Sequence, residues 1–125
     1  MDNLSKAKEE VIRFCEQIEG WFRGDERVTD SGILANFSPD FRMISPDGSR
    51  RNLDDLREWL PQVFGRFPQK QVTLKDLQGY ATDYHVLLTY TEIQDHGEGA
   101  HVRFSSAVFV REGDRMLWLD LWERS

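Results

Sequence analysis

A carboxylate stands at the centre of the apolar stretch "LWLDLWERS" that closes the chain. Asp120 is flanked by two leucines and bracketed by two tryptophans, and burial against tryptophan raises the pKa of a carboxyl group. Such a group can act as a general acid or base near neutral pH. Two other interpretations stay open: Asp120 can form a structural ion pair with Arg103, which would lower its pKa, or it can face water near the chain end.

Residues on neighbouring stretches can support chemistry of this kind. The guanidinium of Arg103 suits an anionic group, although a salt bridge to Asp120 or Glu123 explains this residue as well, and Tyr90 can donate a hydrogen bond to a developing oxyanion. Trp118 and Trp122 can stack a flat ligand, although ordinary core packing explains them as well. The candidate catalytic residue is Asp120, and the expected pocket-lining residues are Trp118, Trp122, Arg103, His101, Ser105, Tyr90 and Trp59.

No motif for a metal, a cofactor or a nucleophile is present. None of His85, His96 and His101 has a cysteine or a second histidine at metal-ligand spacing. The stretch "SPDGSRR" lacks the further ligand positions of a calcium loop, and no G-x-S-x-G sequence occurs. We therefore expect neither a metal nor a cofactor.

Composition limits the class of protein. The 125 residues, 39% hydrophobic and 30% charged, suit one globular domain spanning residues 1–125. A net charge of −6 disfavours nucleic acid and anionic membranes as partners. The single cysteine, Cys15, excludes an internal disulfide. Residues 1–10 lack the apolar region of a signal peptide, and no stretch is long enough to span a membrane, so we expect a cytoplasmic protein.

The spacing of apolar residues predicts helices first and strands afterwards. Helices are expected over about residues 4–22, 31–36 and 53–64, because apolar residues recur there every three or four positions. Their expected end signals are Asn3 or Ser5 and Gly20 or Gly24 for the first helix, and Asn52 and Pro61 for the third.

Strand patterns follow the helices. A small hairpin is expected over residues 41–51, with Pro46-Asp47-Gly48 as its turn. Long strands are then expected over residues 71–79, with a bulge near 76–79, and over 84–94, 100–110 and 116–123. Helices followed by a mostly antiparallel sheet define an α+β fold.

This order of elements resembles the nuclear transport factor 2-like superfamily over nearly the whole chain. The stretch "RFSSAVFVREGDRMLWLDLWERS" resembles the final hairpin of small bacterial members in the ketosteroid isomerase, polyketide cyclase and uncharacterised branches. The resemblance implies a cone-shaped, curved, mostly antiparallel sheet whose concave face is covered by three helices from the N-terminal half. It also implies a deep pocket between sheet and helices, and a convex face that packs against a second copy.

The resemblance also indicates which strand face lines the pocket. Strict alternation places Trp118, Asp120 and Trp122 on one face, which the family comparison puts inside. Leu117, Leu119 and Leu121 would then form a homodimer interface on the convex face. A two-residue turn at Glu112-Gly113 or Gly113-Asp114 adds His101, Arg103, Ser105, Ala107 and Phe109 to the pocket face, whereas a three-residue loop adds Val102, Phe104, Ser106 and Val108 instead.

Two functions remain open, because the superfamily includes isomerases, dehydratases, cyclases, transport adaptors and subunit-association domains. In the first, the chain is a cofactor-free acid–base enzyme acting on an apolar or aromatic small molecule. Asp120 would move the proton, and Arg103 or Tyr90 would stabilise the oxyanion. The alternative is a non-catalytic ligand-binding or subunit-association module, with a pocket filled by side chains or a ligand without turnover.

Overall fold

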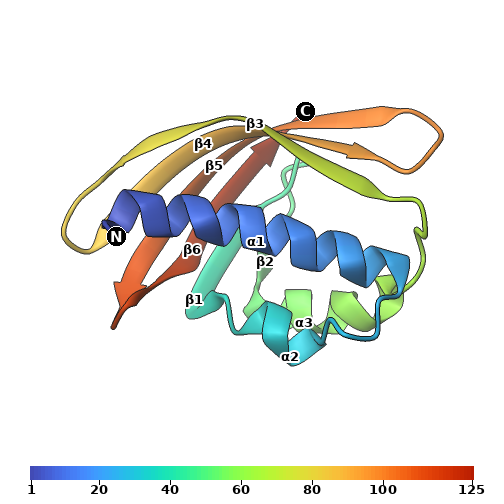
Figure 1. The fold of residues 1–125 in the computed structure, drawn as a ribbon, viewed down its shortest axis with the longest axis horizontal. Coiled ribbons are helices and arrows are strands. Elements are labelled where there is room, and N and C mark those ends of the chain that lie inside the picture. The colour runs from blue at the N-terminus through green and yellow to red at the C-terminus, as the bar shows by residue number, and fades with distance from the viewer.

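A curved sheet of six strands with three helices forms the fold (Figure 1). The computed structural model describes residues 1–125. The strand order is β2-β1-β6-β5-β4-β3, and every neighbouring pair is antiparallel except β1 and β6. The predicted α+β fold, with a curved and mostly antiparallel sheet, is confirmed. The elements are α1 (Asn3–Arg23), α2 (Asp30–Leu34), β1 (Phe37–Ile44), β2 (Arg50–Asn52), α3 (Leu53–Val63), β3 (Gln71–Ala81), β4 (His85–Asp95), β5 (Ala100–Glu112) and β6 (Arg115–Arg124).

Helix α1 packs across the sheet through a stripe of buried residues. Its N-cap is Asp2, whose side chain accepts a hydrogen bond of 2.7 Å from the Ser5 backbone N–H. The predicted caps, Asn3 and Ser5, are therefore both wrong, because the helix begins one residue after Asp2. The helix ends at Gly24, as predicted, with a φ of 80° that favours glycine. The buried residues are Ala7, Glu10, Val11, Cys15, Ile18, Trp21 and Phe22.

Helix α3 starts at the predicted cap and continues past Pro61. Asn52 and Asp55 form a reciprocal capping box with bonds of 3.0 and 2.9 Å. The predicted interruption at Pro61 does not end the helix there, since α3 reaches Val63. The Trp21 indole N–H donates to the Leu60 carbonyl at 2.8 Å, which fixes this last turn against α1.

The turn and bulge predicted for the long strands are confirmed. Glu112 pairs with Arg115, so Gly113-Asp114 is a two-residue turn, with a φ of 59° at Gly113. In β3 the register shifts between Lys75 and Gln78, as a β-bulge requires. The turn puts Ser105, Ala107 and Phe109 on the buried face of β5, with Arg103 half-buried on the same face.

A second bulge, in β6, overturns the predicted strand faces. Phe109 pairs with Trp118 but Val108 pairs with Asp120, so Leu119 is an extra residue and the alternation shifts by one. Trp118 is 1% exposed and lies on the inner face of the sheet, which packs against α1. Trp122 is 62% exposed and lies on the opposite, outer face. The prediction that Trp118, Asp120 and Trp122 share a face is therefore wrong. The predicted outer row of leucines is also wrong at Leu121, which packs against the core.

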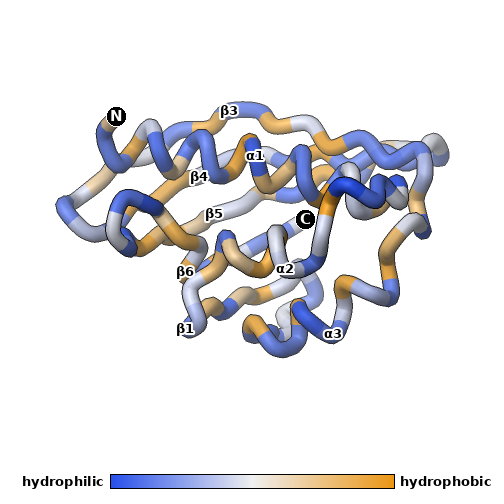
Figure 2. The backbone as a smooth tube through the Cα atoms, turned by 60° about the horizontal axis from the view of Figure 1, so that its bottom comes forward, coloured by the Kyte–Doolittle hydropathy of each residue, from blue (hydrophilic) through white to orange (hydrophobic).

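Aromatic side chains fill the core between α1 and the middle of the sheet. Trp118 lies with its ring centroid 5.3 Å from that of Phe14, 4.6 Å from that of Phe109 and 6.0 Å from that of Phe37. Apolar and polar residues alternate along the strands and around α1, as expected for elements buried on one side (Figure 2). None of the three helices combines the length and apolarity needed to cross a bilayer.

Candidate functional site

Buried polar side chains gather on the inner face of the sheet, toward the end with the β4–β5 turn. Tyr90, Glu92, Ser105 and Glu123 are each no more than 7% exposed. They are neighbours across strands, since Tyr90 and Glu123 both pair with Ser105, and Glu92 pairs with Arg103. We call Tyr90, Glu92, Arg103, Ser105 and Glu123 the interior polar cluster. Because polar groups are costly to bury, such a cluster is a candidate site.

Glu123 is the group in the cluster best suited to proton transfer. Burial, and then the negative charge of Glu92, raise its pKa to about 7. The guanidinium of Arg103, with Nη1 3.5 Å from Glu123 Oε1, acts in the opposite direction without cancelling the effect. A carboxyl with a pKa near neutrality can both accept and donate a proton at physiological pH.

Hydrogen-bond donors surround this carboxyl. Burial raises the pKa of the Tyr90 hydroxyl well above its ordinary value, so the hydroxyl keeps its proton and can donate it to an acceptor. The Ser105 hydroxyl is buried on the strand next to Tyr90, close enough to lower the Tyr90 pKa slightly against the effect of burial, and it makes no other hydrogen bond. Arg103, 37% exposed in its side chain, connects the cluster to the surface.

Glu92 is held on the side of the cluster nearest α1. Its Oε2 accepts a hydrogen bond of 2.8 Å from the Gln94 amide, and the thiol of Cys15 lies 3.8 Å from its Oε1. Burial raises the pKa of the Cys15 thiol, and the charge of Glu92 raises it further. Cys15 is therefore not a nucleophile at neutral pH, because the thiolate is the reactive form.

The structure separates the predicted site residues into three groups. Arg103, Ser105 and Tyr90 meet in the interior polar cluster. His101 and Trp59 pack on aromatic rings outside the cluster: the ring centroids of His101 and His96 are 5.7 Å apart, and those of Trp59 and Phe22 are 5.9 Å apart. The remaining predicted residues lie outside the cluster, namely Trp118 in the aromatic core and Asp120 and Trp122 on the outer face.

The outward position of Asp120 changes its interpretation. Its Oδ1 lies 3.2 Å from Nη2 of Arg42, and the two side chains are 39% and 75% exposed. The predicted burial of Asp120 in the pocket is wrong, because the β6 bulge turns it outward, and its partner is Arg42 rather than Arg103. The geometry assigns to Glu123, three residues later, the environment that we predicted for Asp120.

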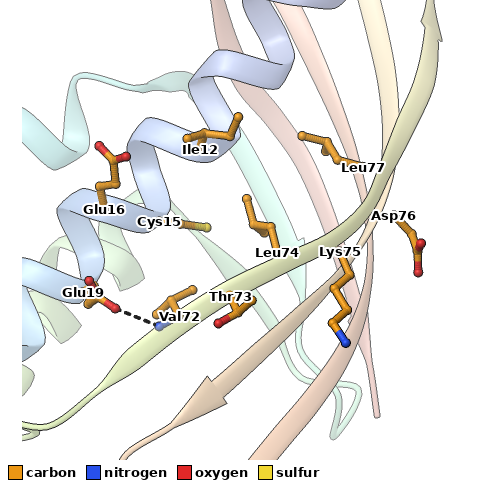
Figure 3. Close-up of a pocket in the computed structure, with 10 residues that line it drawn as sticks. All are labelled: Ile12, Cys15, Glu16, Glu19, Val72, Thr73, Leu74, Lys75, Asp76 and Leu77. Atoms are coloured by element: carbon orange, nitrogen blue, oxygen red, sulfur yellow. Dashed lines mark hydrogen bonds between the residues drawn. The ribbon is translucent and has the colours of Figure 1, made fainter.

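Two hollows lie beside the cluster rather than within it. A groove of about 490 Å³ runs between α1 and β3, with Ile12, Val72 and Leu74 pointing into it and Lys75 and Asp76 pointing away (Figure 3). Cys15 lines this groove and also contacts Glu92. A second hollow of about 440 Å³ has only polar residues, proline and glycine in its lining.

Sequence reasoning did not select Glu92 or Glu123 as site residues, although the predicted salt bridge of Arg103 to Asp120 or Glu123 is confirmed for Glu123. Glu92 continues the buried alternation of Val86, Leu88 and Tyr90, so extending that period of two along β4 would have found it. Glu123 has no such signal, because the bulge at Leu119 reverses the phase of β6. No group of three or more histidine, cysteine, aspartate or glutamate side chains is arranged to hold a metal ion.

Comparison with known proteins gives the family. The profile of the SnoaL-like domain matches residues 13–117, most of the chain. The chain belongs to the SnoaL-like domain family. Comparison with curated proteins found no significant match. The nuclear transport factor 2-like resemblance predicted from the sequence is confirmed, since solved structures of that class share the fold of this SnoaL-like chain.

Three solved structures illustrate that likeness. A nuclear transport factor 2-like protein of unknown function from Pseudomonas aeruginosa is 25% identical, with a TM-score of 0.87 over 95% of this chain and 97% of that one. A Streptomyces avermitilis protein, provisionally named a dehydratase of the same family, is 14% identical, with a TM-score of 0.78 over 98% and 94%. A cystatin-like domain of unknown function from Nostoc punctiforme is 16% identical, with a TM-score of 0.67 over 94% and 76%.

Proposed function

We propose that this SnoaL-like chain is a cofactor-free enzyme that moves a proton on a small organic molecule, with Glu123 as the general acid and base. The observation that carries the proposal is a carboxyl buried beside Arg103, Tyr90 and Ser105 with a pKa of about 7. One carboxyl with hydrogen-bond donors is sufficient for isomerisation, for dehydration or for aldol-type cyclisation. The substrate class is an apolar or aromatic carbonyl compound.

The proposed chemical step uses only residues of this chain. Ionised Glu123 accepts a proton from the carbon next to the substrate carbonyl, and the electron pair of that C–H bond moves to the carbonyl oxygen. Arg103 and the protonated hydroxyl of Tyr90 stabilise the resulting oxyanion by donating hydrogen bonds. Glu123 then returns the proton to another carbon, or to a leaving hydroxyl that departs as water.

Membership of the SnoaL-like family supports this class of reaction without specifying the substrate. The name of the Streptomyces avermitilis relative, provisionally a dehydratase, is consistent with proton abstraction next to a carbonyl. That relative shares only 14% identity, so the likeness adds the fold alone.

Deuterium exchange tests the proposed reaction without a known substrate. We expect the chain to accelerate exchange of the α-protons of acetophenone and 2-tetralone in deuterated buffer, followed by proton NMR. Glu123→Gln should slow the catalysed exchange by about 10²–10⁴-fold, while Asp120→Asn exchanges at the wild-type rate. Equal rates for wild type and Glu123→Gln would contradict the role of Glu123.

One observation favours the non-catalytic alternative. The two hollows lie beside the interior polar cluster, and Trp118 fills the core between α1 and the sheet with aromatic contacts. A SnoaL-like binding or association module would have this closely filled interior. Saturable binding of the same ketones with no exchange above buffer would support the module over the enzyme.

We also propose that the outer sheet face packs against a second copy. Exposed apolar side chains gather there, with Val102 43%, Phe104 42% and Trp122 62% exposed. Leu117 and Leu119 are half-buried and lie outside the core cluster, whereas Leu121 packs against the core. Light scattering at micromolar concentration should give the mass of a dimer, and Trp122→Lys should shift it toward the monomer. A monomeric wild type would contradict this contact.

A further inference from the structure

Lys70 is a buried cation at the edge of the interior polar cluster. It is the last residue of the loop between α3 and β3, and it is only 6% exposed. Its Nζ lies 4.8 Å from the centroid of the Phe22 ring and 4.5 Å from that of Phe67. It donates one hydrogen bond, of 3.2 Å, to Oε1 of Gln94. Gln94 in turn donates to Glu92, so Lys70 is joined to the cluster.

The ammonium of Lys70 has more donors than partners. An ammonium carries three N–H donors, and only one is used here. No carboxylate oxygen lies within 4.0 Å of Nζ, since none of the ion pairs includes Lys70. The two aromatic rings compensate part of the charge, but burial of an ammonium remains costly without an anion. Lys70 therefore has no carboxylate in direct contact, and the charge of Glu92 acts on it only from beyond 4.0 Å.

Other basic side chains surround the same end of the sheet. Burial is the main cause that lowers the pKa of Lys70, the charge of Arg103 lowers it further, and the charge of Glu92 acts in the opposite direction. The His96 ring lies 5.7 Å from Phe67 and stacks on His101, and the Nδ1 atom of His96 is buried without a partner. This gathering of nitrogen donors stands out in a chain of net charge −6, and it favours an anionic ligand group.

We propose that Lys70, together with Arg103, binds the carboxylate of a small organic acid whose apolar body lies against Phe67 and Trp59. This inference deepens the proposed function and rests on it for one point, that the substrate reaches Glu123 from this end. It identifies the substrate class as a carbonyl compound that also carries a carboxylate. The free donors of Lys70 and the exposed guanidinium of Arg103 are the groups that would hold the two carboxylate oxygens.

The charges favour a carboxylate over a phosphate. Lys70 and Arg103 contribute two positive charges, and ionised Glu92 contributes one negative charge. The sum is one positive charge when Glu123 is protonated and zero when Glu123 is ionised for proton abstraction, so a carboxylate leaves at most one uncompensated negative charge. A phosphate dianion would leave an excess negative charge beside two buried glutamates.

A matched pair of probes tests the carboxylate site. Benzoate and benzamide have nearly the same shape, but only benzoate carries a charge. We expect benzoate to bind at least about tenfold more tightly than benzamide, in titrations followed by amide chemical shifts and by the Lys70 ε-carbon resonance. Lys70→Met keeps an unbranched apolar chain between the two rings and should weaken benzoate about tenfold or more. Lys75→Met, on the exposed face of β3, should bind like wild type.

The outcomes separate this inference from the proposed function. Equal affinity for benzoate and benzamide in the wild type, or an unmoved Lys70 resonance, would overturn the carboxylate site even if Lys70→Met fails to fold. Glu123→Gln should retain benzoate binding while losing proton exchange. Benzoate selectivity that depends on Lys70 supports the inference even where exchange is absent, in which case only the proposed enzyme fails.

Discussion

Replacing Glu123 with glutamine is expected to stabilise the chain by about 3 kcal/mol at pH 8 and to change its stability little at pH 4. The folded chain holds the proton of Glu123 up to a pKa of about 7, whereas an unperturbed carboxyl releases it near 4.5. Between these values the unfolded state binds fewer protons, so wild-type stability falls as the pH rises. Glutamine has nearly the same shape but does not ionise, so the free energy of unfolding of the variant does not fall with pH for this reason.

Urea unfolding of both proteins at the two pH values measures the effect, because the titrations shared by wild type and variant cancel in the difference. Asp120→Asn is the matched control on the same strand. Its carboxylate is 39% exposed and pairs with a 75% exposed Arg42, so the loss should be at most about 1 kcal/mol at either pH. A Glu123→Gln effect that is the same at both pH values would show that burial does not perturb this carboxyl.

The two tryptophans of β6 should differ strongly in their contribution to stability. Trp118→Ala should cost about 3–5 kcal/mol, because it removes a 1% exposed ring packed against Phe14 and Phe109. Trp122→Ala should change the stability of the dissociated chain by no more than about 0.5 kcal/mol, because its side chain is 62% exposed.

Chemical denaturation tests this contrast, at a concentration where light scattering gives the mass of a monomer. The pair of variants examines the β6 bulge itself, since strict alternation would bury both rings on one face. Similar losses for Trp118→Ala and Trp122→Ala would contradict the bulge at Leu119 and return Asp120 to the inner face.

Much of the fold was predictable from the sequence because local patterns determine it. The apolar spacing of α1, the cap at Asn52 and the Gly113-Asp114 turn each have a local physical cause, and each occurs as predicted. The parallel pairing of β1 with β6 was not predicted. It joins residues far apart in the sequence, and no turn or periodicity indicates such a contact.

The candidate site was predictable only in part. Arg103, Ser105 and Tyr90 followed from the turn length and from strand alternation, and the structure places them together. The carboxyl did not, because one extra residue in β6 exchanges Asp120 for Glu123 on the inner face. Lys70 was hidden for another reason: it lies in a loop, where neither period applies, and its burial depends on two rings from other elements.

The central claim is that Glu123 is a buried carboxyl adapted to proton transfer, and its pKa tests this most directly. The measurement is a carboxyl-carbon NMR titration of the wild-type chain, with the Glu123 resonance assigned by its absence in Glu123→Gln. The structure predicts a pKa of about 7. A value near 4.5 would mean that the carboxyl is solvated or fully paired with Arg103, and would contradict its role as the general acid and base.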